Sequence, residues 1–203
     1  MIIFGLSVFY FGLIGTGQFH CPHCGGDREY KHKRATRFFT LFFLPVIPLG
    51  KVGEVVQCQT CRKRFDPAVL RLPTASQMAH TLLGGARAIA VTMLRAGGTS
   101  PAAVSAAVEA VRQAGEPRYD VSQLDADLRQ PAHVSEEAIR ALASQTAVPA
   151  RESYVASAVR IALADGPLSP AEREATLALA ANLGLSSAHA HGVIVTVEQS
   201  TRA

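Results

Sequence analysis

The chain has 203 residues, a formal net charge of +4 and a hydrophobic content of 48%, so it has enough apolar material to build a core. Its four cysteines are too few for a disulfide scaffold in a chain of this length. No run of about 18 uninterrupted apolar residues occurs, which excludes an ordinary multi-span membrane protein.

Charge and aromatic content divide the chain in two. Residues 1–72 hold ten Lys and Arg against four Asp and Glu, together with all nine phenylalanines. Residues 73–203 hold ten Arg against twelve Asp and Glu, with no Lys and no Phe, and they are rich in Ala. A break this sharp predicts two domains, residues 1–72 and 76–203, joined by a short segment at Pro73.

The first domain contains two CxxC pairs separated by 33 residues, Cys21 with Cys24 and Cys58 with Cys61. A two-residue gap lets two thiolates converge on one ion, and two such pairs form the closed tetrahedral shell that suits a structural Zn²⁺. We expect Gly25 and Gly26 to supply the positive φ that the first turn requires. A redox role is the alternative, but it needs only one pair.

Histidines flank the first pair at His20 and His23. Since four cysteines already complete the shell, we interpret both as residues of the turn. The preceding segment, residues 1–19, is rich in β-branched and aromatic residues, and residues 54–57 lead directly into the second pair. Both segments are predicted to be strands beside the metal site.

Two stretches without charge, residues 2–15 and 38–50, are too short to span a bilayer, which needs about 20 residues. The first also lacks the basic region and cleavage site of a signal peptide. We predict that both are strands that pack on each other. The alternative is an attachment face for a membrane surface or a protein partner. That face would combine four phenylalanines with four cations: Phe38, Phe39, Phe42, Phe43, Lys31, Lys33, Arg34 and Arg37.

The segments FHCPHCGG and FFTLFFLPVIPLGKVGEVVQCQTC carry a resemblance to a known family. They are similar to a small bacterial zinc-ribbon family, and the likeness covers about residues 1–70. The resemblance implies a zinc-ribbon fold and a bound Zn²⁺.

From Ser76 onward, apolar residues recur every three to four positions, as in helices. Ser169, Pro170 and Glu172 predict a helix start with a capping box, and Gly184 predicts a Schellman-type end. The segments 94–101 and 163–170 align without gaps, which predicts a repeated helix–turn–helix unit. Turn signals delimit the predicted helices at 76–96, 101–114, 121–129, 135–147, 151–164, 170–183 and 186–199.

The segment IALADGPLSPAE, residues 161–172, resembles the A-D-G-x-x-x-x-x-E signature of the TerB family. That family is an all-helical domain associated with tellurite resistance and stress response, and the likeness extends over residues 76–203. It implies an acidic metal site that maps onto Asp165 and Glu172. The alternative is that Asp165 is a turn residue and Glu172 only a helix cap.

No catalytic triad order, phosphate loop or open metal shell is visible, so we expect the protein not to be an enzyme. His189 and His191 are two residues apart, which points them to different faces of a helix. The predicted fold is α+β multidomain, a small β zinc ribbon followed by an all-α TerB-like helical bundle.

The predicted function is a cytoplasmic zinc-binding adaptor of the stress response. Its ribbon would bind a partner or peripherally a membrane surface, and its helical domain would bind a protein partner. The alternative is a nucleic-acid-binding ribbon with a helical regulatory domain, because basic residues beside aromatic ones are also the footprint of such proteins.

Overall fold

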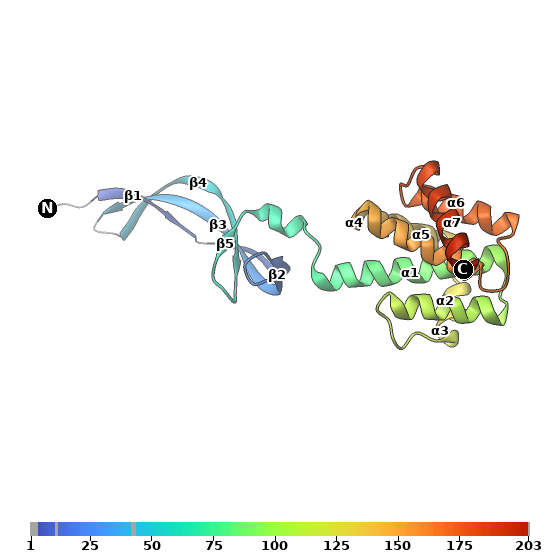
Figure 1. Cartoon of the computed structure of the whole chain (residues 1–203). Coiled ribbons are helices and arrows are strands. Elements are labelled where there is room, and N and C mark those ends of the chain that lie inside the picture. The colour runs from blue at the N-terminus through green and yellow to red at the C-terminus, as the bar shows by residue number, and fades with distance from the viewer. Residues whose placement is uncertain (1–3, 11, 42–43, 203) are drawn as a thin grey trace. The chain divides into compact units, whose positions relative to one another are not determined.

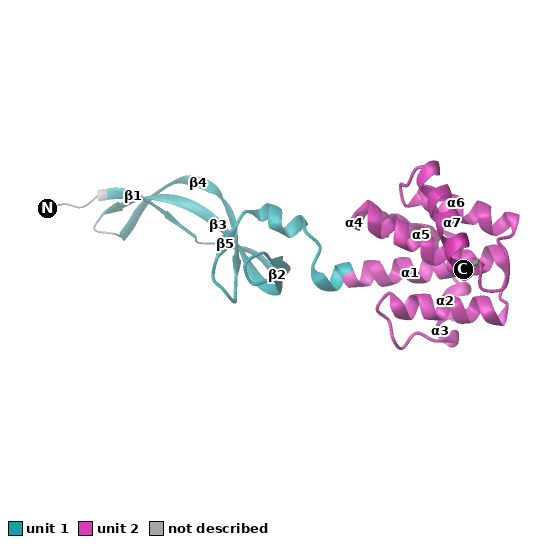
Figure 2. Ribbon diagram, in the orientation of Figure 1, with its two compact units in different colours: residues 1–78 teal, residues 79–203 magenta. Residues whose placement is uncertain are grey.

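The computed structural model describes residues 4–10, 12–41 and 44–202 (Figure 1). The chain divides into two compact units, Met1–Met78 and Ala79–Ala203, here called the ribbon unit and the helical unit (Figure 2). An antiparallel sheet followed by seven helices in the described residues confirms the predicted fold class. The division between the units falls inside the first helix.

The sheet of the ribbon unit is organised around one long central strand. Its strands are β1 (Phe4–Phe9), β2 (Leu13–Cys21), β3 (Gly26–Leu41), β4 (Leu44–Cys58) and β5 (Arg64–Phe65). β2 pairs with the first half of β3 and β1 with its second half, while β4 follows the other side of β3 from Tyr30↔Cys58 to Leu41↔Leu44. The short β5 pairs with the end of β4. Both ends of β3 are therefore flanked by strands on two sides.

Among the described residues of the sheet, the buried hydrophobic cluster lies at one end. Phe19 is 1% exposed, and its ring lies 5.6 Å from that of Tyr30 and 5.9 Å from that of Phe65, measured between centroids. Val56 is fully buried beside them, and the 3₁₀ helix η1 (Pro67–Arg71) adds Val69 and Leu70. This small cluster surrounds the cysteines.

The other end of the sheet is exposed, which corrects the prediction for the two apolar stretches. They do form strands, since β1 and β4 both pair with β3, and Phe9 packs against Phe38, but most of their large aliphatic side chains stay exposed. We call this end the apolar blade: β1, residues 36–41 of β3 and residues 44–52 of β4. Its large exposed side chains, between 36% and 68% accessible, are Leu6, Val8, Leu41, Leu44, Val46, Ile47, Leu49 and Val52.

The predicted attachment face lies partly on this blade. Phe38 and Phe39 are half-buried, and the Phe38 ring meets Phe9 edge to face at 5.7 Å; Phe42 and Phe43 lie outside the described residues. Among the predicted cations Lys33 donates a hydrogen bond to the Gln57 side chain at 2.9 Å. The other three are exposed: Lys31, Arg34 and Arg37.

All seven predicted helices occur. They are α1 (Ala75–Gly97), α2 (Pro101–Gln113), α3 (Val121–Leu128), α4 (Ala132–Gln145), α5 (Val148–Ala162), α6 (Pro170–Asn182) and α7 (Ser187–Arg202). α4 and α5 begin three residues earlier than predicted, because their N-caps, Pro131 and Ala147, make no side-chain hydrogen bond and leave no capping signal in the sequence.

The aligned segments adopt the same local structure. Ser100 caps α2 by accepting a hydrogen bond from the Ala103 N–H, and Ser169 caps α6 in the same way from the Glu172 N–H. In both copies a proline follows the cap at the first helical position. A helix, a glycine-containing turn and a Ser-Pro helix start thus occur twice in the helical unit.

Glycines on α1 allow a close approach to α4. A Cβ at Gly85 would lie 2.6 Å from Cδ2 and 2.9 Å from Cβ of Leu142, whereas nothing lies within 4 Å of a Cβ at Gly84. We expect Gly85→Ala to destabilise the helical unit by about 1–3 kcal/mol through overpacking. Gly84→Ala is the matched control and should stabilise it by about 0.5–1 kcal/mol, because alanine is the better helix former. Thermal unfolding followed by circular dichroism separates the two, and equal effects would contradict the close packing.

Candidate metal centre

The sheet brings the two CxxC pairs to one place. Cys21 ends β2 and Cys58 ends β4, while Cys24 and Cys61 lie in the turns that follow. Since β2 and β4 flank the same half of β3, their ends lie on either side of that strand and the two turns face each other. Cys21 and Cys58 are fully buried, and the other two are partly exposed.

The four sulfur atoms have the spacing of a metal shell. They all lie within 4.8 Å of one another, and Cys21 Sγ is 3.9 Å from Cys61 Sγ. A Zn–S bond of about 2.3 Å places the sulfurs of a tetrahedron about 3.8 Å apart. All four cysteines are free thiols, and a disulfide would need about 2.05 Å. The cluster therefore fits one tetrahedral metal ion.

Backbone amides prepare this site for negative charge. Burial opposes ionisation of the Cys58 thiol, but hydrogen bonds from the N–H groups of Cys61 and Thr60 outweigh it and lower its pKa to about 7. The pKa of Cys24 is raised to about 12, first by burial and then by hydrogen bonds with the other thiols. The Cys58 thiol thus ionises near neutral pH, whereas Cys24 needs the charge of a cation, so metal binding at Cys24 displaces a proton.

The two turns have the same backbone geometry. Gly25 N–H donates to the Cys21 carbonyl at 3.0 Å, and Arg62 N–H donates to the Cys58 carbonyl at 3.1 Å. Gly25 has a φ of 67° and Arg62 a φ of 63°. The prediction for Gly25 is confirmed, but that for Gly26 is wrong, because Gly26 already belongs to β3 and has no positive φ. The sequence did not point to Arg62, since a left-handed arginine has no recognisable signal.

These equivalent positions provide a matched pair of substitutions. We expect Gly25→Ala to lower the stability of the ribbon unit by about 1–2 kcal/mol, the cost of a left-handed conformation for a residue with a Cβ. No atom lies within 4 Å of that Cβ, so the effect would come from the backbone alone. Arg62→Gly should leave stability unchanged or raise it. Competition with a chelator measures both effects, and an unchanged Gly25→Ala variant would contradict the expectation.

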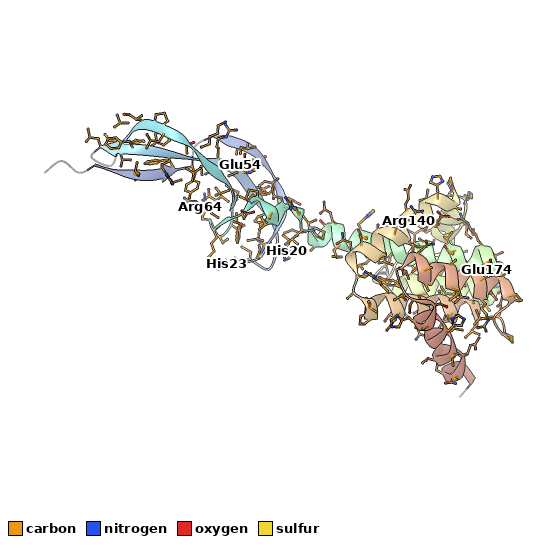
Figure 3. The ribbon with its side chains drawn as sticks, turned by 90° about the horizontal axis from the view of Figure 1, so that it is seen from above. His20, His23, Glu54, Arg64, Arg140 and Glu174 are labelled. Carbon is orange, nitrogen blue, oxygen red and sulfur yellow. The ribbon has the colours of Figure 1, made fainter. Side chains whose placement is uncertain are left out.

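The flanking histidines do not belong to the sulfur cluster. Among the described residues the group that could hold a metal consists of the four cysteines alone. His23 is exposed, and His20 Nδ1 lies 3.6 Å from Asp27 Oδ1 (Figure 3). His23 therefore lies in the turn, in agreement with its interpretation, whereas His20 belongs to β2, just before the turn.

Asp27, two residues beyond the turn glycine, connects the first pair to helix α1. Its two carboxylate oxygens accept hydrogen bonds from the N–H groups of Ala75 at 2.8 Å and Ser76 at 3.1 Å. The bond from Ala75 is the largest cause of a lowered pKa for Asp27, so the charged form is favoured. A negative charge at a helix N-terminus is also favourable to the helix dipole. The start of α1 is thus fixed to the ribbon unit.

The second candidate pair lies in the helical unit. Asp165 is exposed in the turn after α5. Glu172 is 6% exposed, and its Oε2 accepts hydrogen bonds from the N–H of Ser169 at 2.8 Å and from its hydroxyl at 2.7 Å. This confirms the predicted capping box. The carboxylate also packs over Gly97, where a Cβ would overlap it. An acidic metal site here stays a prediction.

Two family comparisons match these two parts. A model described as a zinc-ribbon family matches residues 19–72. A model described as Tellurite resistance protein TerB matches residues 88–193, more than half of the chain. The chain belongs to the TerB family. It carries a zinc-ribbon domain before the TerB domain, as both sequence resemblances indicated. No curated protein matches the chain, and no solved structure does.

In the parts of the chain that the structure describes, none of the helices combines the length and the apolar character needed to cross a bilayer.

Proposed function

We propose that this TerB protein is a non-enzymatic adaptor of a stress response. Zn²⁺ holds the ribbon together, the apolar blade attaches the chain to a membrane surface or a partner, and the TerB domain binds another protein. The observation that carries this proposal is the blade, where eight large apolar side chains are at least 36% exposed. Contiguous exposed apolar surface of this kind marks interaction sites in monomeric proteins.

The donor set supports zinc as the metal. Thiolates select soft or borderline ions, and a tetrahedral set of four sulfurs is typical of structural Zn²⁺. Four protein ligands also leave no position for water or substrate, which favours a structural rather than a catalytic ion.

The TerB domain offers a groove that suits a protein ligand. It has a volume of about 270 Å³ and runs between α1, α2 and α5. Five of its nine lining residues have small side chains, so apolar side chains of a partner could enter it, and Tyr154 and Arg160 add polar groups to the lining. The residues that contribute small side chains are Ala86, Ala110, Ala114, Ser153 and Ser157.

Fractionation of native cells that express tagged full-length chain tests the adaptor role. We expect the wild type to sediment with membranes or in large complexes, and both Val46→Ser/Ile47→Ser and Cys58→Ser/Cys61→Ser to be released. Val121→Ser/Val195→Ser is the matched control, since these residues are 50% and 47% exposed but lie in the helical unit. If the Val46→Ser/Ile47→Ser variant keeps the wild-type distribution, the blade is not an attachment site.

The same cell fractions also distinguish the adaptor role from the alternative, a nucleic-acid-binding ribbon. Basic residues beside aromatic ones in the ribbon support it, among them the exposed Lys31 and Arg34. Release of the wild type by nuclease, together with oligonucleotide binding that falls steeply with salt, would favour that alternative.

A further inference from the structure

We propose that the apolar blade inserts into one leaflet of a bilayer that contains anionic lipids. This inference rests on the attachment role proposed for the blade and names the surface to which it attaches. It is carried by three observations: apolar exposure on both faces of the blade, a cationic base and a limited length.

The blade is apolar on both faces. Ile47 lies opposite Phe39 and Pro48 lies opposite Phe38 without a register shift, so these consecutive exposed residues of β4 point to opposite faces, and Ile47 is 52% exposed. In β1, Leu6 and Val8 share one face and are 63% and 39% exposed. A protein docked on one face would leave the other in water, whereas acyl chains surround both.

Cations lie where the blade begins. Arg37 and Lys51 are exposed and occupy neighbouring positions of the β3–β4 ladder, since Arg37 lies opposite Gly50 and Thr36 opposite Lys51. Between them along the chain, residues 38–50 carry no charge. Residues 31–56 together hold five basic residues and one acidic residue. The uncharged end of the blade is complementary to the acyl chains, and the basic residues where the blade begins are complementary to the anionic headgroups.

The length of the blade sets the depth of insertion. From Phe38 to Leu41 the described part of β3 extends about 10–13 Å at 3.3 Å per residue. Apolar faces at a membrane interface reach about 5–10 Å into the boundary between headgroups and acyl chains. The hydrocarbon core is about 30 Å thick, so the blade reaches into one leaflet and places Arg37 and Lys51 at the level of the phosphates.

The edge strands of the blade restrict it to this boundary. In the described part of the sheet, β1 and the first part of β4 are each paired on one side only, with β3. An open sheet edge is not tolerated in the hydrocarbon centre, because its backbone groups need hydrogen-bond partners. Water and headgroups supply such partners at the boundary, and Pro45 and Pro48 in β4 have no N–H to satisfy.

The chain has no tryptophan, so a single introduced one reports on its own surroundings. We would compare Ile47→Trp in the blade with Val121→Trp in the helical unit, two positions that are 52% and 50% exposed. With vesicles of phosphatidylcholine and phosphatidylglycerol, the emission of Ile47→Trp should shift to the blue and be quenched by lipids brominated near the headgroup more than by lipids brominated near the chain end. Val121→Trp should not change. A zinc content of one per chain confirms that each ribbon is folded.

Charge substitutions test the cationic base. Each basic residue near an anionic surface contributes about fivefold to binding, so Arg37→Gln/Lys51→Gln should weaken partitioning into these vesicles about 25-fold. Arg118→Gln/Arg129→Gln removes the same charge from exposed positions of the helical unit and should have no effect. Pure phosphatidylcholine vesicles and high salt should weaken binding of the wild type.

Two results would overturn the proposal. One is an unchanged Ile47→Trp emission with anionic vesicles at low salt. The other is a blue shift without vesicles that grows with protein concentration, which would assign the blade to a second copy of the chain. In either case the fractionation experiment decides the adaptor role separately. If the Val46→Ser/Ile47→Ser variant is released from the membranes or large complexes, the adaptor role stands. If the variant keeps the wild-type distribution, the adaptor role is wrong as well.

Discussion

Removal of the metal is expected to unfold the ribbon unit and to leave the helical unit folded. The buried cluster of the ribbon unit consists of Phe19, Cys21, Val56 and Cys58, two of which are metal ligands. Binding of structural zinc by such sites contributes about 10–16 kcal/mol, which exceeds what so small a core supplies. The helical unit has its own extensive core, with fully buried residues such as Leu124, Leu142 and Val155, and needs no metal for it.

Hydrogen exchange measured by mass spectrometry resolves the two units in the intact protein. In chelator, peptides from β2, β3 and β4 should lose protection, while peptides from α2, α5 and α6 keep it. Elemental analysis before and after treatment controls for the loss of one zinc per chain. Protected ribbon peptides in metal-free protein would contradict the expectation, and so would a helical unit that unfolds together with the ribbon.

Replacing a large side chain by alanine should have very different effects at the two ends of the sheet. We expect Phe19→Ala to destabilise the ribbon by about 3–5 kcal/mol, because the ring is 1% exposed and fills the space beside the metal site. Ile47→Ala should cost little, because that side chain is 52% exposed and packs against no core. Zinc affinity, measured by competition with a chelator, reports the loss of stability in both variants, because folding and metal binding are linked.

The control for this pair is the metal content at saturating zinc, which should be one per chain for both variants. A large loss of affinity for Ile47→Ala would mean that the blade is interior after all. The proposal of membrane insertion would then lose its main support.

Local chemical signals were sufficient to predict the metal site and most helix ends. Spacing alone identified the four cysteines. The Schellman-type end predicted at Gly184 is confirmed by hydrogen bonds from Leu185 N–H to the Ala180 carbonyl and from Gly184 N–H to the Ala181 carbonyl, both 2.9 Å long. These features depend on residues close together in sequence, so the sequence carries the information directly.

Features that depend on distant packing could not be predicted in this way. Hydropathy indicated strands at residues 2–15 and 38–50, but it contains no information on whether another layer covers them. The contact of Gly85 with Leu142 and that of Gly97 with Glu172 join residues more than fifty positions apart. A glycine in a helix pattern gives no sign of which side chain will pack against it.

The β3–β4 hairpin also determines how the metal site is assembled during folding. In a blade that is apolar on both faces, sliding one strand by a residue exchanges similar side chains, so the blade itself specifies its register only weakly. At the other end of the same hairpin Tyr30 lies opposite Cys58, and a slip by one residue would turn that sulfur to the wrong face. A tetrahedral metal ion can close its shell of four sulfurs only in the correct register. The metal therefore selects one alignment of two long strands whose exposed half would accept several.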